Sequence, residues 1–153
     1  MNQNNIKPQE LMATDLRIGN WVTLSGTMPM IIYEIHEDCF YAKDEKNSSF
    51  KNTWADIQPI PLSDEVLLKC GFEKYQWQNA MYIKTVFGHL YLHFYKDRII
   101  TSFKNITYDH EGQKMKSLGF IGHKESVENI IYLHQLQNLF YSLTQSELET
   151  NFF

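Results

Sequence analysis

The segment "NIIYLHQLQNLFYSLTQS", at residues 129–146, contains no Asp, Glu, Lys or Arg. Charged residues make up 21% of the 153-residue chain, so a charge-free run of this length indicates a segment that is withdrawn from water or covered by a partner. Three structures have this property: a membrane span, a helix of the protein core, and the centre of a binding surface.

The polar content of this segment excludes a membrane span. Its length reaches the lower limit for a transmembrane helix, which is about 17 residues. Inside a bilayer, however, each polar group without a partner costs several kcal/mol of transfer free energy. The polar residues that would have to be desolvated together are Asn129, His134, Gln135, Gln137, Asn138, Ser142, Thr144 and Gln145.

A helical wheel instead predicts a helix that is buried on most of its circumference. Its apolar positions are Leu133, Leu136, Leu139, Phe140 and Leu143, with a second cluster of Val127, Ile130 and Tyr141. The start of the helix stays open, because "VENII" also fits a last strand that would leave the helix to begin near Tyr132. Thr144 and Glu147 have the spacing of a capping box, which predicts a final short turn.

The remaining side of the helix is a neutral polar stripe of Gln135, Asn138 and Ser142. Such a stripe forms hydrogen bonds without the cost of desolvating a charge. It suits a helix clamped between a barrel and a sheet of its own chain, and it also suits an interface core, where charge is depleted. We favour the clamp. If the helix is an interface, His134, Gln135 and Asn138 are its candidate binding residues.

The N-terminal part of the chain has the pattern of a small β fold. Residues 1–13 are polar and are predicted to be a frayed tail. Short strand-type runs follow at 21–24, 28–35, 39–42 and 50–54, then a helical turn at 55–57 and an edge strand at 58–62. A helical turn before the last of five short strands is typical of an SH3-like barrel, although the strand count also fits several other small β folds.

A short helix follows this region and leads into a second set of strands. Ser63 is a suitable N-cap, and Gly71 is predicted to end the helix. Strand patterns then extend from residue 73 to about 108, with turns expected at 78–80 and 96–97. The segment "HEGQKMKS", at residues 110–117, is predicted to be a loop, and "SLGF" after it to be a second helix stop.

The predicted fold class is therefore α+β. We expect an N-terminal SH3-like small β-barrel at residues 14–62, followed by an antiparallel β-sheet packed with a C-terminal helix at residues 63–153. At 153 residues the chain is long enough to bury a core without disulfides or metals.

Catalytic and metal-binding motifs are weak in this sequence. His89 and His93 have a zinc-type spacing, but on a strand their α-carbons lie roughly 13 Å apart, too far to share one metal. His110 lies in an acidic cluster, yet Lys114 occupies the position where a zinc-protease helix needs its second histidine. There is no nucleophile elbow, phosphate loop or dinucleotide fingerprint. We predict no metal, no cofactor and no enzymatic activity.

A nucleic-acid surface is the alternative binding function. The net charge of −4 gives no overall attraction to nucleic acid, but residues 69–124 carry 9 basic and 4 acidic side chains. Cations and aromatic rings on a β surface can track and stack single strands. The candidate residues in the sheet of residues 73–104 are Lys84, Tyr91, Tyr95 and Arg98.

Two cysteines, Cys39 and Cys70, occur in a chain whose first residues, "MNQNNIKPQE", are too polar for a secretory signal. This pattern is typical of reduced, partly buried thiols and of a cytoplasmic protein.

Three stretches together resemble a known family. They are "LRIGNWV", then "IQPIPL" running into "LLKCGF", and "YLHQLQNLFYSLTQSEL". They are similar to a group of small, uncharacterised bacterial proteins that are common in prophages and mobile elements. Residues 73–126 show no such similarity. The resemblance implies a cytoplasmic setting and a phage-related origin, and it implies no activity.

Taken together, these patterns favour a non-catalytic protein-binding or adaptor module of phage or mobile-element origin. Its expected partner is a protein or a second copy of the chain, and a membrane is excluded. A nucleic-acid-binding protein ranks second, and an enzyme with a site assembled across the two halves ranks last.

Overall fold

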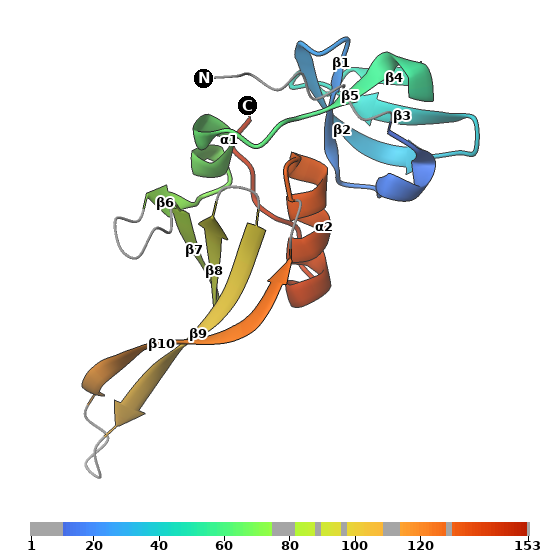
Figure 1. Ribbon diagram of the computed structural model, residues 1–153. Helices are drawn as coiled ribbons and strands as arrows, with labels where there is room; N and C mark the ends of the chain where they lie inside the picture. Colours follow the sequence, from blue (N-terminus) through green and yellow to red (C-terminus); the bar gives the residue numbers. More distant parts are fainter. Residues whose placement is uncertain are drawn as a thin grey trace, which may run out of the picture. The chain divides into compact units, whose positions relative to one another are not determined.

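The computed structural model describes residues 11–74, 82–87, 90–95, 98–108, 114–127 and 130–152 (Figure 1). These residues form two antiparallel sheets together with helices, so the chain is α+β as predicted. The chain divides into two compact units, Met1–Val66 with Ile131–Phe153, and Leu67–Ile130. The C-terminal helix therefore belongs to the same unit as the N-terminal sheet, whereas the sequence pattern assigned all of residues 63–153 to a single second part.

The first sheet contains five short strands in the order β4-β3-β2-β1-β5. Its strands are β1 (Trp21–Leu24), β2 (Met28–Ile35), β3 (Cys39–Lys43), β4 (Ser49–Thr53) and β5 (Ile57–Pro59). A 3₁₀ turn, Ala13–Asp15, precedes the sheet, and another, Trp54–Asp56, precedes β5. The strand predictions are confirmed here, with β5 shorter than expected. The cause of this agreement is that turn residues separate each apolar run.

This sheet is open, and the expected closed barrel is not formed. Within the described residues β4 and β5 are its two edges, and β5 pairs only with β1. Beyond β5 the chain pairs with the segment before the C-terminal helix instead of with β4. Leu62 N–H donates to the carbonyl of Ile131 at 2.9 Å, and Leu133 N–H donates to the carbonyl of Ile60 at 2.9 Å. The C-terminal segment thus covers an edge that would otherwise be unpaired.

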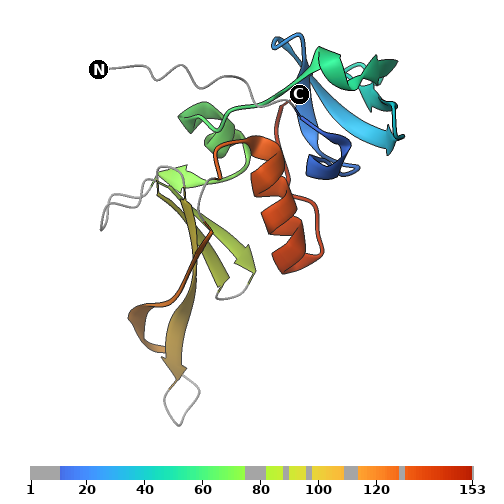
Figure 2. The ribbon, with the colours of Figure 1, turned by 45° about the vertical axis from the view of Figure 1, so that its right-hand side comes forward.

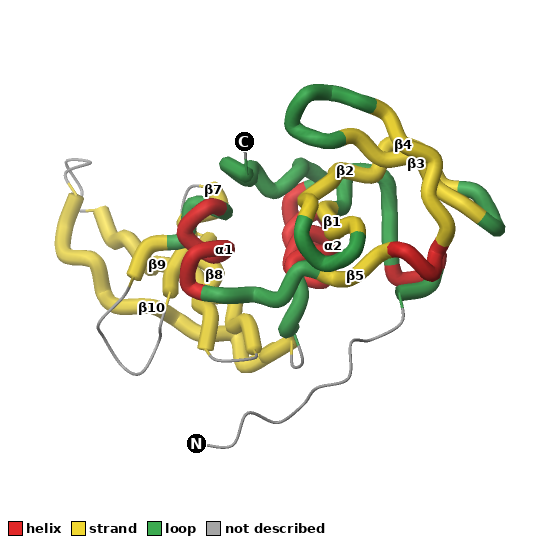
Figure 3. Tube along the Cα trace, turned by 90° about the horizontal axis from the view of Figure 1, so that it is seen from above, coloured by secondary structure: helices red, strands yellow, loops and turns green. Residues whose placement is uncertain are grey.

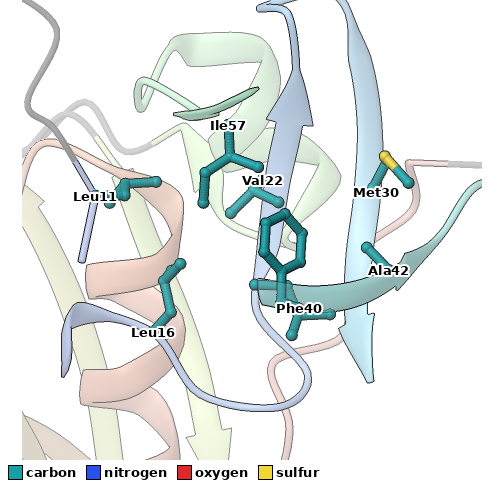
Figure 4. Packing of buried hydrophobic residues seen from close by; sticks show 8 residues of the cluster. Leu11, Leu16, Val22, Met30, Phe40, Ala42 and Ile57 are labelled. Carbon is teal, nitrogen blue, oxygen red and sulfur yellow. The ribbon is translucent and has the colours of Figure 1, made fainter. Parts of the chain in front are cut away.

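One face of the first sheet carries the hydrophobic core (Figure 4). Its buried members are Leu11, Leu16, Val22, Met30, Ile32, Phe40, Ala42 and Ile57. The ring of Trp54 packs on Phe40 with centroids 5.1 Å apart. Leu11 is only 4% exposed, so the prediction of a frayed tail up to residue 13 is wrong at its end. Leu11 packs into a core formed by residues later in the chain. The polar residues around position 11 give no sign of this contact.

Helix α1 (Asp64–Lys69) begins and ends at the predicted signals. The Ser63 hydroxyl accepts a hydrogen bond from the backbone N–H of Val66 at 3.2 Å, which makes it the N-cap. After the helix, Gly71 has a φ of +73°, a conformation that glycine adopts without strain. The N–H of Phe72 then donates to the carbonyl of Leu67 at 3.0 Å, which closes the helix end.

The second sheet is a simple meander in the order β10-β9-β8-β7-β6. Its strands are β6 (Glu73–Lys74), β7 (Tyr82–Phe87), β8 (Leu90–Tyr95), β9 (Arg98–Tyr108) and β10 (Lys114–Val127). Figures 1 and 2 show β9 and β10 side by side, in agreement with their pairing. The predicted turns at 78–80 and 96–97 lie outside the described residues, as do His89, Asp109 and His110.

The predictions for residues 110–120 are wrong where the structure describes them. Lys114–Ser117, expected in a loop, and "SLGF", expected at a helix end, both lie within β10. The strand pairs with β9 from Lys114 opposite Tyr108 to Val127 opposite Ile99. The register shifts along this pairing place bulges in the ladder. Pairing with a long neighbouring strand overrides local turn and glycine signals.

Helix α2 (Leu133–Thr144) lies beside β1 (Figure 3). It begins just after Tyr132, as in the alternative where "VENII" precedes the helix. Its C-cap is Gln145, which has a φ of +56° and donates its N–H to the carbonyl of Tyr141 at 2.8 Å. The final turn predicted at Thr144 is wrong, because the Glu147 carboxylate binds Arg17 instead. None of the helices in the described residues has the length and apolarity needed to cross a bilayer.

Candidate functional site

Gln137 on α2 is the centre of a buried polar contact with the loop before β1. Its Oε1 atom accepts a hydrogen bond from the backbone N–H of Trp21 at 2.9 Å. Its Nε2 atom donates to the carbonyl of Gly19 at 3.0 Å. The side chain is 1% exposed, so these bonds replace water entirely. The amide therefore satisfies backbone groups where the first strand begins.

Asn138, the next residue of α2, extends this contact. Its Oδ1 atom accepts from the Asn20 side chain at 3.0 Å, and its Nδ2 atom donates to the carbonyl of Asp15 at 3.2 Å. Asn20 is fully buried, and its Oδ1 atom accepts from the backbone N–H of Arg17 at 2.9 Å. We call Asn20, Gln137 and Asn138 the amide clamp. Because its members bond one another and the backbone, the cluster rigidifies the joint between α2 and the sheet.

The other residues of the polar stripe also find partners within the chain. Gln135 turns back and accepts from the backbone N–H groups of Ile131 and Tyr132, at 2.9 and 3.1 Å. It therefore caps its own helix. The Ser142 hydroxyl donates to the carbonyl of Leu139 at 2.7 Å. These intrachain bonds account for the polar groups that an interface would otherwise have to satisfy.

His134 is buried and stacks on Tyr132, with ring centroids 5.8 Å apart and planes 13° apart. Its Nδ1 atom is buried and makes no hydrogen bond within the described residues. Burial lowers the pKa of His134 to about 4, and the carboxylate of Asp15 offsets part of this effect. The imidazole is therefore neutral near pH 7, and its side chain lies inside the fold, not on a surface.

The four residues predicted for nucleic-acid binding lie on three adjoining strands, β7, β8 and β9. Lys84 is half-buried, and its Nζ atom donates to the carbonyl of Cys70 at 2.7 Å. It thus binds the end of the chain's first α-helix. Tyr91 pairs with Ser102, and Tyr95 with Arg98, in the β8–β9 ladder. The side chains of Tyr91, Tyr95 and Arg98 are outside the described part.

An apolar groove of about 740 Å³ follows the edge strand β5 and the segment after it. Its lining consists mainly of prolines and aliphatic side chains, with a few neutral polar groups. The lining residues are Thr23, Gly26, Gln58, Pro59, Ile60, Pro61, Leu62, Ser63, Val66, Ile131 and Tyr132. This volume lies within the usual range of ligand pockets. The sequence carries no signal for this groove, because its walls come from segments some 70 residues apart and local patterns do not extend that far.

Arg17 was also missed as a candidate. Its guanidinium forms a two-pronged ion pair with Glu147, with Nη1–Oε1 at 2.6 Å and Nη2–Oε2 at 2.9 Å. It also lies over the Tyr141 ring, 4.4 Å from the centroid. The only signal in the sequence was its place in the "LRIGNWV" run. A bidentate arginine is a group that recognises carboxylates and phosphates.

The described residues contain no group of three His, Cys, Asp or Glu side chains that could hold a metal ion. Cys39 and Cys70 are free and buried, as the sequence predicted. Burial raises the pKa of the Cys70 thiol to about 12, with Lys84 partly opposing the rise. The thiol is therefore protonated and unreactive near neutral pH.

Of the stretches that carry the family resemblance, "LRIGNWV", "IQPIPL" and "YLHQLQNLFYSLTQSEL" meet in the first unit, whereas "LLKCGF" lies in the second. "LRIGNWV" contains Arg17, Gly19 and Trp21, which contact α2 and the segment after it. "IQPIPL" pairs with the residues just before α2 through the bridge of Pro61 to Tyr132. The "HQLQN" run thus has a structural role in holding these stretches together.

Comparisons with known proteins find no protein family, no curated protein and no solved structure that matches this chain. The function must therefore be inferred from the chain's own residues and their contacts.

Proposed function

We propose that this protein is a non-catalytic protein-binding or adaptor module of phage or mobile-element origin. The observation that carries the proposal is the apolar groove along β5. Among the described residues its lining contains no Asp, Glu, Lys, Arg, Cys or His, so the groove offers apolar surface for binding and no base that would activate its Thr, Ser and Tyr hydroxyls.

The chemistry of β5 favours a partner held by apolar contacts. Pro59 and Pro61 have no backbone N–H, and Ile60 and Leu62 already bond the segment before α2, so this edge offers a partner strand little of a hydrogen-bond ladder. The exposed Pro61 and the half-buried Leu62 and Ile131 offer apolar surface instead. Burying such surface contributes roughly 25 cal/mol per Å².

We further propose that the first sheet is an SH3-like fold. Five short strands and the 3₁₀ turn Trp54–Asp56 before β5 support this assignment. The family resemblance supports the phage-related origin. The cytoplasmic setting is supported by the same resemblance and by the two free, buried thiols.

Site-specific photo-crosslinking in host cells tests the proposed groove. A photoreactive residue is placed at the exposed Gln58, which lines the groove, and a matched one at the exposed Lys51, which does not. We expect position 58 to label one protein that position 51 leaves unlabelled. Adding Ile131→Arg should abolish that label. Equal labelling from both positions would contradict the proposal.

A nucleic-acid-binding protein is the second candidate. Its support is that Lys84, Tyr91, Tyr95 and Arg98 lie on neighbouring strands of one sheet. If this sheet binds single strands, affinity for an oligonucleotide should fall steeply between 50 and 200 mM salt, as counterions are released. Arg98→Ala should then reduce the salt slope by about one. A flat salt dependence would rule out this surface.

A further inference from the structure

Residues 146–152, which we call the C-terminal strap, run back along the loop before β1. Glu147 binds Arg17, and Leu148 is only 3% exposed. At the far end, the ring of Phe152 lies 5.2 Å from the ring of Trp21. The strap thus covers a surface that begins at a cationic side chain and ends at an aromatic one.

The strap contacts the rest of the unit through side chains: Glu147 binds Arg17, Leu148 is buried, and the Phe152 ring packs on Trp21. It has no regular secondary structure. Its ion pair is open to water, with 53% of the Glu147 side chain exposed. Exposed ion pairs are weak, because water solvates both charges and salt screens them. The strap is therefore the part of this unit that a competitor could displace.

The surface under the strap is organised by groups outside it. Arg17 donates from Nη1 to the carbonyl of Ile18 at 3.0 Å and from Nη2 to the carbonyl of Gln137 at 3.3 Å. The Tyr141 ring supports the guanidinium from one side. These contacts keep the guanidinium in place without Glu147. Its Nε atom is buried and makes no hydrogen bond to any of the residues that the structure describes.

Gly19 allows an acidic side chain to approach this arginine closely. A Cβ atom at Gly19 would lie 3.2 Å from the carboxylate atoms of Glu147, a tight contact that would push the carboxylate away from this position. The residue also has a φ of +93°, which favours glycine. The loop therefore leaves space for a carboxylate beside Arg17.

We propose that the strap is an intramolecular ligand, and that the surface beneath it binds an extended segment of a partner protein. That segment carries a carboxylate for Arg17 and, five residues later, an aromatic ring for Trp21, as Glu147 and Phe152 do. The tethered strap competes at high effective concentration, so the partner binds weakly until the strap is released. This surface is separate from the β5 groove and does not depend on it.

A labelled peptide with the sequence QSELETNFF tests the proposal on the full chain. We expect Glu147→Ala combined with Phe152→Ala to bind this peptide at least tenfold more tightly than the wild type, because the strap then competes less. Adding Arg17→Ala should abolish the gain. Glu149→Ala, an equal change in charge at an exposed position of the strap, is the matched control and should leave the affinity at the wild-type value.

Equal peptide affinity of the wild type and the strap-weakened variant would overturn the proposal, and so would a gain that survives Arg17→Ala. If the combined variant does not fold, the wild-type chain is titrated with the peptide instead and followed by NMR. With the peptide in millimolar excess, the NMR signals of Glu147 and Leu148 of the chain itself should move toward those of a free segment as the strap leaves. Unchanged signals would overturn the proposal. Photo-crosslinking from position 58 tests the β5 groove separately. The groove proposal and the strap proposal can therefore fail independently.

Discussion

The two sheets of this protein have the same number of strands but are assembled differently. In the second sheet each strand pairs with the next one along the chain. In the first, β1 pairs with β5, and α2 is added from the far end of the chain, with Gln137 bonded to Trp21 across 116 positions. Closing such long loops costs chain entropy before any contact forms. The stability of the first unit therefore depends on the few contacts that join its distant segments.

This comparison predicts that substitutions in α2 destabilise the first unit in proportion to burial. The largest effect is expected for Leu136→Asp, since Leu136 is fully buried. A carboxylate there should lower the free energy of unfolding by about 4 kcal/mol or more. Urea unfolding followed by circular dichroism measures this loss. Leu143→Asp, at a 38% exposed position of the same helix, should cost less than about 1 kcal/mol.

Light scattering on Leu136→Asp also tests whether α2 belongs to the fold or to an interface. We expect a chain with an unfolded first unit. A folded monomer that replaces a wild-type oligomer would show that the helix is an interface, and the comparison between the two sheets would then fail.

Gln137→Leu tests the amide clamp with nearly the same side-chain volume. The substitution removes the buried hydrogen bonds from Gln137 to the N–H of Trp21 and to the carbonyl of Gly19. We expect a loss of about 3 kcal/mol in the free energy of unfolding. Ser142→Ala on the same helix removes an exposed hydrogen bond and should cost less than about 0.5 kcal/mol. Similar losses for both variants would show that the clamp contributes nothing particular.

The buried His134 should make the stability of the first unit depend on pH. Its pKa is about 4 in the folded chain and 6.5 ordinarily, so between these values the unfolded chain binds more protons. Stability should therefore fall as the pH drops from 6.5 to 4, by about 3 kcal/mol in total, and stay unaffected above 6.5.

Urea unfolding at several pH values measures this dependence. His134→Leu should remove most of the slope between pH 4 and 6.5. His36→Gln, which changes an exposed histidine, should keep it. A slope that persists unchanged in His134→Leu would contradict the burial argument.

The smallest expected effect belongs to the ion pair between Arg17 and Glu147. A double-mutant cycle with alanine at each position should give a coupling of about 0.5 to 1 kcal/mol, because the pair is partly exposed. The coupling should shrink at 1 M salt, where exposed charges are screened. A coupling above about 2 kcal/mol would mean that the strap is a fixed part of the fold.

Local sequence patterns predicted the elements whose signals lie within a few residues. β1 and β2 have the predicted bounds, and α1 begins after Ser63 and stops before Gly71. Each is delimited by turn residues or caps, which act through neighbouring backbone groups. The prediction failed for residues 114–120, because the ladder with β9 outweighs what "SLGF" favours locally.

For the candidate sites, the sequence identified the charge-free helix and its polar stripe but not their partners. The stripe shows only that Gln135 and Asn138 need hydrogen bonds. That Asn138 binds Asn20, that Arg17 binds Glu147, and that β5 borders a groove are set by segments brought together from opposite ends of the chain. Composition and periodicity are properties of neighbours along the chain, and so they indicated that this helix is mostly buried, although Leu143 is 38% exposed and Gln137 only 1%. Which distant groups meet on the faces of the helix depends on the packing of the whole unit, and the tertiary structure alone decides it.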